Sequence, residues 1–343
     1  MTVSSSRQAN EQFLIDLIER YGDKVAKREY FSVDYINYLK NIESQIHDSP
    51  QRDWAMRAHD KILSGVYYFD NPLVQDVLVP VASRHLGSDF SLVESIPVGF
   101  LPSRIINGFE ACGPNGECAI VLDDPILAYS ICLFRAYFGY ALWYFSSPYS
   151  WNLFQEDYGR ALVALAFYNV TRKDEYRKKV LPIMSAIAKQ EPAFENEEDC
   201  ASFRVLMFIL LHEYGHIVKG HLDPSNTSLW SFPENMSIRV FDRNQSQEFE
   251  ADILASLWML SLDPSIEHRR SFLLTTGVLF RFMDLCERFR SQSSDTHPPA
   301  IDRWCRIKSD PQIIGGVETP IIKELDNHFD ELVDGLGKAG VFK

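Results

Sequence analysis

Apolar positions recur with helical spacing over most of the chain. Apolar residues return every three or four positions in residues 13–21 and again in residues 35–42, which predicts amphipathic helices near the N-terminus. From Asp124 the pattern is again helical almost to the end, with Asp-Pro start signals at 124–125 and 263–264. The sequence therefore predicts an α+β protein that is mostly α.

Residues 90–123 have a different pattern, which is typical of β-strands. We expect strands at Phe90–Val98, Ile105–Cys112 and Cys118–Leu122, with a Pro-Asn-Gly turn between the last two. Cys112 and Cys118 should then lie near each other across a hairpin, and we expect them to be reduced because the N-terminus carries no apolar secretion signal. A boundary near Gly87 would separate an N-terminal helical region, residues 1–88, from a second domain, residues 89–343.

A nearly continuous apolar run, residues 203–211, leads directly into His212-Glu-Tyr-Gly-His216. A helix that is apolar on nearly all sides is buried, so polar groups at its end need partners. On a helix His212 and His216 project about 40° apart, close enough to share one ion. Glu213 projects about 100° from His212, so it can act on a water without binding the ion. This arrangement predicts metal-activated hydrolysis with Glu213 as general base.

A third ligand is expected in Gln247-Glu-Phe-Glu-Ala-Asp252, where Glu248 and Asp252 share one helical face. Glu248 would complete the metal site, and Asp252 would accept a hydrogen bond from a ligand histidine, by preference His212. Glu250 is the competing ligand, although it projects about 200° from Glu248. An amphipathic helix with a solvated acidic face is the alternative for this segment.

Two neighbouring features are assigned supporting roles. His221 lies about 180° round the helix from His212, so we expect a hydrogen-bonding residue at the helix end instead of a third histidine ligand. Residues 225–245 are rich in polar residues, which predicts a loop between the two metal-binding helices.

With these residues in place, the chain resembles zinc metallopeptidases whose third ligand is a glutamate. HEYGHIVKGH, from His212, matches the HExxHxxxxH pattern of the HtpX heat-shock protease and CAAX prenyl protease families, and Glu248-Phe-Glu-Ala-Asp resembles their E-x-x-A-D segment. Thr296-His-Pro-Pro-Ala-Ile-Asp-Arg is similar to their S/T-H-P segment with a later arginine, and Asn107-Gly-Phe-Glu-Ala to their N-A-F-A segment. A looser likeness connects the chain with Lit-type phage-exclusion peptidases and ImmA/IrrE regulatory peptidases.

The resemblance implies a zincin-like domain in which Zn²⁺ is held by His212, His216 and Glu248. It also implies that His297 stabilises the oxyanion of the reaction, and a loop histidine ahead of a helix remains the alternative for this residue. The implied function is a metalloendopeptidase, with a role in stress or phage defence.

The resemblance also implies a substrate-binding strand. In zinc peptidases of this class an edge strand pairs with the bound peptide through main-chain hydrogen bonds. The hairpin of residues 107–122 is the candidate for that strand, and it would bring Asn107 and Phe109 to the substrate.

Charge and hydropathy narrow the functional class. The net charge of −13 disfavours nucleic acid and anionic membranes as partners. The aromatic-rich segment Ala128–Phe145 carries Arg135 near its middle, so we expect a buried helix and not a membrane span. We therefore predict a cytoplasmic enzyme acting on an intracellular protein or peptide. The alternatives are a membrane-embedded protease and a catalytically silent zinc-binding regulatory protein.

Overall fold

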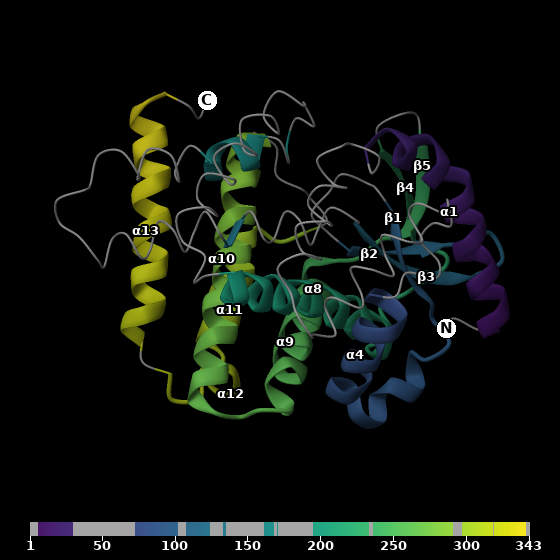
Figure 1. Cartoon of the computed structure of the whole chain (residues 1–343), viewed down its shortest axis with the longest axis horizontal. Helices are drawn as coiled ribbons and strands as arrows, with labels where there is room; N and C mark the ends of the chain where they lie inside the picture. Colours follow the sequence, from purple (N-terminus) through teal and green to yellow (C-terminus); the bar gives the residue numbers. More distant parts are fainter. Residues whose placement is uncertain are drawn as a thin grey trace. The chain divides into compact units, whose positions relative to one another are not determined.

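The computed structural model describes ten stretches of the chain: residues 6–29, 73–101, 108–123, 133–134, 161–167, 170, 195–232, 236–290, 297–317 and 319–340. Within them the protein is α+β and mostly α, with one five-stranded mixed sheet (Figure 1). This confirms the predicted fold class. The helix expected at residues 35–42 and nearly all of Ala128–Phe145 lie outside the described residues. No helix within the described stretches is long and apolar enough to cross a membrane.

Contacts between residues group the chain into two compact units that alternate along the sequence. The first unit takes Met1–Ser103, Asn107–Asp124 and His216–Asp242, and the second takes Arg104–Ile106, Pro125–Gly215 and Arg243–Lys343. Neither unit begins or ends at the boundary expected between residues 88 and 89, which stays a prediction.

The first unit contains the sheet, whose strand order is β1-β3-β2-β5-β4. The strands are β1 (Val98–Leu101), β2 (Gly108–Cys112), β3 (Cys118–Asp123), β4 (Thr227–Phe232) and β5 (Met236–Phe241). Strands β1 and β3 are parallel and the other pairs are antiparallel. The predicted hairpin is confirmed, because β2 pairs with β3 in a register that places Cys112 opposite Cys118.

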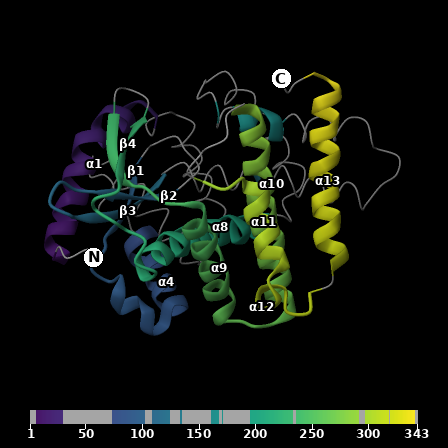
Figure 2. The ribbon, with the colours of Figure 1, turned by 180° about the vertical axis from the view of Figure 1, so that it is seen from behind.

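Four helical segments of the first unit are described: α1 (Arg7–Glu29), the π-helix η1 (Leu73–Leu78), α4 (Val79–Leu86) and the 3-10 helix η2 (Gly87–Leu92). Helix α1 packs on β1 and β3, as both views of the ribbon show (Figures 1 and 2). Gly99 permits this approach, because a Cβ there would lie 3.0 Å from the Leu14 side chain. Asn10 of α1 is buried and accepts a hydrogen bond from the Cys118 amide at 3.0 Å.

Two predictions made from the sequence are wrong. The expected strand Phe90–Val98 instead starts with the end of the helical turn η2, continues as a turn and irregular chain over residues 93–97, and reaches strand β1 only at Val98. The expected loop at 225–245 instead forms β4 and β5, because β5 joins the sheet by pairing Val240 with Ala111 of β2. The β2–β3 hairpin consequently lies inside the sheet, between β1 and β5, and is not an edge strand.

The second unit is helical. Its described elements are α8 (Glu195–Val218, whose last turn is grouped with the first unit), α9 (Gln245–Ser261), α10 (Ile266–Arg290), α11 (Ala300–Ser309), α12 (Pro311–Ile314) and α13 (Thr319–Lys338). Helix α10 contacts α9, α11 and α13 (Figures 1 and 2). Trp304 of α11 is fully buried against Gly277 of α10, where a Cβ would lie 2.8 Å from its ring. This packing fixes α11, the helix that brings Arg303 to the site described next.

Candidate metal centre

Helix α8 carries the histidine motif into the protein interior. Its apolar residues are buried, as predicted; these are Val205, Leu206, Met207, Phe208, Ile209, Leu210 and Leu211. At the end of this run His212 is 6% exposed, Glu213 1% and His216 0%. Buried polar groups need partners, and the following elements supply them.

The start of α9 determines where its acidic residues point. Asn244 is the N-cap: its side chain accepts a hydrogen bond from the Gln247 amide at 3.1 Å, and the Gln247 side chain accepts one from the Asn244 amide at 2.9 Å. This reciprocal capping box fixes the first turn. Glu248 lies in that turn and Asp252 one turn later, and both are buried, whereas Glu250 is exposed. The structure therefore brings Glu248 to the site and leaves Glu250 outside.

Helices α8 and α9 approach closely beside the motif. A Cβ on Gly215 would lie only 3.3 Å from Cα of Ala251. The glycine inside His212-Glu-Tyr-Gly-His216 thus allows the two backbones to come together, with the small side chain of Ala251 opposite. This contact explains how ligands from two helices can reach one point.

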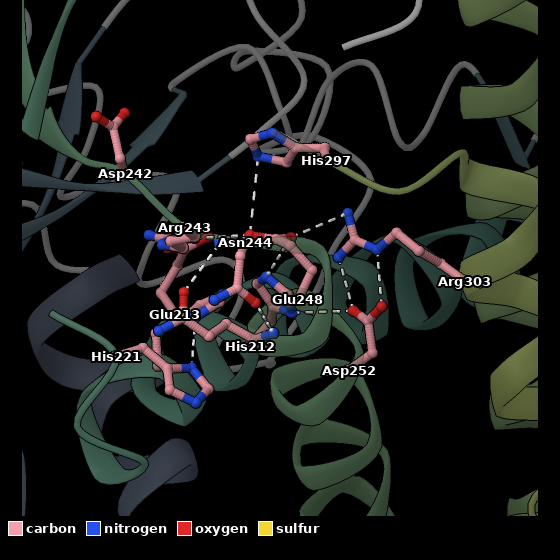
Figure 3. A network of polar contacts seen from close by, with 12 residues as sticks. His212, Glu213, His221, Asp242, Arg243, Asn244, Glu248, Asp252, His297 and Arg303 are labelled. Atoms are coloured by element: carbon pink, nitrogen blue, oxygen red, sulfur yellow. Dashed lines mark hydrogen bonds and ion pairs between the residues drawn. The ribbon is translucent and has the colours of Figure 1, made fainter. Parts of the chain in front are cut away.

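Among the described residues, His212, His216 and Glu248 form a group whose ligand atoms all lie within 4.8 Å of one another. His212 Nε2 is 3.5 Å from Glu248 Oε2. The other ring nitrogen, Nδ1, is 2.9 Å from Asp252 Oδ1 (Figure 3). The contact expected between Asp252 and His212 is therefore present. For the neutral ring, this contact favours the tautomer with the proton on Nδ1, which leaves Nε2 to bind a metal.

His221 has the same relation to the second histidine. Its Nδ1 lies 3.0 Å from Nδ1 of His216, so one ring nitrogen donates and the other accepts. When His216 Nδ1 is the donor in this pair, its Nε2 carries no proton and can bind a metal. As predicted, His221 is a hydrogen-bonding residue at the helix end. Two imidazoles and one carboxylate are a donor set typical of catalytic zinc, so the residues present fit that ion.

Arg303 of α11 contacts both carboxylates of α9, Asp252 and Glu248. Its Nε and Nη2 atoms donate to the two oxygens of Asp252, each at 2.7 Å (Figure 3). This two-pronged contact is the strong form of a carboxylate–guanidinium pair. Nη1 lies 3.5 Å from Glu248 Oε2, and the guanidinium lies 5.1 Å from the centre of the Phe280 ring. Arg303 thus holds the carboxylate that orients His212.

Arg243, between β5 and the N-cap of α9, approaches from another direction. Its Nη2 donates to Glu213 Oε2 at 3.0 Å, and its Nη1 lies 3.5 Å from Glu248 Oε1. The side chain is only 7% exposed. One cation therefore contacts both the expected general base and the expected carboxylate ligand.

Of the other residues predicted for the site, His297 lies at the centre and Phe109 lies in the sheet. His297 reaches the centre: its Nε2 is 3.8 Å from Glu248 Oε1, and 30% of its side chain is exposed (Figure 3). Phe109 is buried within β2, with its ring 5.7 Å from that of Trp230. Asn107 lies outside the described residues.

Burial and charge shift the pKa values of these groups. Burial acts to lower the pKa of His212, but hydrogen bonds and charges from Asp252 and Glu248 outweigh it and raise the pKa to about 10. Burial raises the pKa of Glu213 to about 8, with the His212 charge opposing and Glu248 assisting. Burial also acts to raise the pKa of Glu248, yet His212 and Arg303 hold it well below its usual range. Glu248 is therefore an anion suited to binding a cation.

Comparison with known proteins agrees with this chemistry. The sequence model of one peptidase family, Peptidase U49, matches residues 150–312. The matched segment is just under half of the chain, and it contains every residue of the centre from His212 to Arg303. This match supports a peptidase. No curated protein matches the chain, and no solved structure does.

The sequence alone did not reveal the contacts of two residues of the centre, Arg303 and Arg243. Arg303 was noticed only as part of a resemblance, and its pairing with Asp252 needed the packing of α11. Arg243 gave no signal, because it lies in a segment that was expected to be a loop. The alternation of apolar and polar residues in Met-Ser-Ile-Arg-Val, from Met236, would have revealed strand β5 and hence a different path for the chain before Arg243.

Proposed function

We propose that the protein is a zinc-dependent endopeptidase that hydrolyses peptide bonds of an intracellular protein or peptide. The observation that carries the proposal is the buried group of His212, His216 and Glu248 with Glu213 beside it. The match to a peptidase family over the same residues supports it.

In this proposal His212, His216 and Glu248 hold the ion. A bound zinc ion would supply a water of lowered pKa and polarise the substrate carbonyl. Asp252 and His221 each hold the Nδ1 side of one ligand histidine, at 2.9 Å and 3.0 Å. These contacts orient the imidazoles, so less freedom is lost when the ligands bind an ion.

Glu213 is the proposed general base. It would accept the proton of the attacking water and return it to the leaving amine. Its position next to His212 and its 1% exposure suit this role, because a buried carboxylate beside the ion can act on the bound water away from bulk solvent. Zinc peptidases separate ligand and base in this way, and an intact Glu213 has no required role in a merely structural metal site.

His297 is the proposed donor to the oxyanion that forms on the substrate carbonyl. Its partial exposure and its position beside Glu248 support a contact with substrate. For pairing with the peptide backbone we propose an edge strand of the described sheet, β1 or β4, in place of the predicted hairpin carrying Asn107 and Phe109. The reason is that β2 and β3 are each paired on both sides, whereas β1 and β4 end the described sheet.

The test compares wild-type protein with Glu213→Gln. Glutamine has nearly the same size but cannot accept the proton, so peptide hydrolysis should fall by at least about 100-fold. Zinc content, by mass spectrometry, and thermal stability should not change. Glu248→Gln should lose zinc while the matched control Glu250→Gln keeps it. Wild-type cleavage by Glu213→Gln, with zinc bound, would contradict Glu213 as the general base. Zinc binding by wild-type protein without any cleavage would favour a zinc-stabilised regulatory protein instead.

A further inference from the structure

Arg243 is a charged residue of the centre for which metal-activated hydrolysis has no immediate need. It precedes Asn244, the N-cap of α9, so its backbone is held next to the start of the helix that carries Glu248. Its side chain is 7% exposed and its guanidinium contacts Glu213 and Glu248. A buried cation between two buried carboxylates has a large effect on whatever charge enters the same space.

The contacts of Arg243 are compatible with a metal bound at the centre. Glu248 Oε2 is the oxygen near His212 Nε2, at 3.5 Å, whereas Arg243 lies at 3.5 Å from the other oxygen, Oε1. Arg243 likewise contacts only one oxygen of Glu213, Oε2, at 3.0 Å. Arg243 thus contacts one oxygen of each carboxylate, and in Glu248 this oxygen is not the one that lies near His212 and Arg303.

The charges of the centre divide into two sets. Asp252 is matched by the two short hydrogen bonds from Arg303. Glu213 and Glu248 share Arg243, and Glu248 has only longer contacts, at 3.5 Å, with both arginines. Arg243 therefore forms a hydrogen-bonded ion pair with Glu213 at 3.0 Å, and its positive charge offsets part of the charge of both carboxylates.

We infer that Arg243 is a positioning residue that fixes the orientation of Glu213 and acts as a built-in countercharge, which weakens metal binding while it speeds hydrolysis. The inference rests on the proposed function. Its two consequences have opposite signs. A positive charge near the ion repels it, so removing that charge should tighten metal binding. Without the hydrogen bond to Oε2, however, the base is less well aligned, and misalignment slows the chemical step.

The experiment measures Zn²⁺ affinity by competition against a chelator, and separately measures kcat and KM. Arg243→Gln should bind Zn²⁺ about tenfold more tightly than wild type, since a nearby unit charge is removed. Its kcat should fall about ten- to a hundredfold with little change in KM, as expected for a misplaced base. Arg243→Lys keeps the charge but loses the fork, so its Zn²⁺ affinity should stay within about twofold of wild type while its kcat remains reduced.

Controls separate this inference from the proposed function. Arg306→Gln removes an exposed arginine of α11 and should change neither measurement. If wild-type protein binds no Zn²⁺, the proposed function itself fails. If wild type binds Zn²⁺ but Arg243→Gln binds it equally or more weakly, Arg243 is not a competing countercharge and the inference is overturned. A tightening of Zn²⁺ binding by about tenfold in Arg243→Lys, relative to wild type, would overturn it as well. This comparison with wild type remains measurable if the Gln variant does not fold.

Discussion

The two oxygens of Glu248 face different surroundings. On the Oε2 side lie His212 and Arg303, and behind them Asp252, with 2.7 Å contacts between Arg303 and Asp252 and nearly complete burial. On the Oε1 side lie Arg243 and His297, at 3.5 Å and 3.8 Å, and His297 is 30% exposed. One carboxylate thus separates a tightly bonded region from a looser, partly open one.

This difference indicates that the Oε2 side serves metal binding and the Oε1 side serves the substrate. Short, fully buried contacts hold side chains in one geometry, so the metal ligands are already oriented before an ion binds. Longer contacts beside a partly exposed imidazole leave space for a substrate carbonyl. Changes on the Oε2 side should therefore alter metal affinity first, and changes on the Oε1 side should alter turnover first.

The largest effect is expected on the open side. His297→Ala removes the proposed oxyanion donor, so kcat should fall by about 100-fold or more, the usual effect of losing one such donor. Zn²⁺ affinity should stay within about twofold of wild type, because His297 is not a ligand. Steady-state kinetics and chelator competition on one preparation give both values. A loss of affinity as large as the loss of turnover would remove the distinction between the two regions.

On the closed side, Asp252→Ala should weaken Zn²⁺ binding about 10- to 100-fold, because His212 loses the partner that fixes its ring. The free energy of unfolding should also fall by about 3–5 kcal/mol, since Arg303 is left as a buried charge without its principal partner. Chelator competition and denaturant unfolding would measure the two effects. Unchanged affinity together with unchanged stability would contradict this account of Asp252.

Arg303→Gln should act in the same direction with a smaller effect, about tenfold on Zn²⁺ affinity, since Asp252 remains to hold His212. The effects of the Arg303 and Asp252 substitutions on Zn²⁺ affinity should not be additive. With Asp252 already replaced by alanine, Arg303→Gln should weaken Zn²⁺ binding little further. A double-mutant cycle tests this coupling. Full additivity would mean that Arg303 acts on the ion by some route other than Asp252.

The residues of the centre also differ in how well the sequence predicts them. His212, His216 and Glu248 were found because helical geometry alone determines which side chains share a face. Asp252 was found for the same reason, four residues after Glu248. Arg303 completes the closed side through the packing of α11 onto α10, which is a contact between distant segments and leaves no periodic signal.

The sheet shows the opposite case. The hairpin of β2 and β3 was predicted from its local turn, but its neighbours in the sheet were not, because β5 comes from a segment more than 100 residues later. A strand becomes an inner or an edge strand only through such distant pairing. The expectation that the hairpin was the edge failed for this reason, and with it the expected place of Phe109.

The capped start of α9 determines where the chain can tolerate an inserted residue. Each residue added to a helix turns everything beyond it by about 100°. One residue inserted between Asn244 and Glu248 would therefore swing Glu248 and Asp252 together off the ligand face, with no ligand substituted. One residue inserted in the connection between β4 and β5 would leave the phase of the helix intact. Among related sequences, alignment gaps should accordingly be absent from residues 244–252.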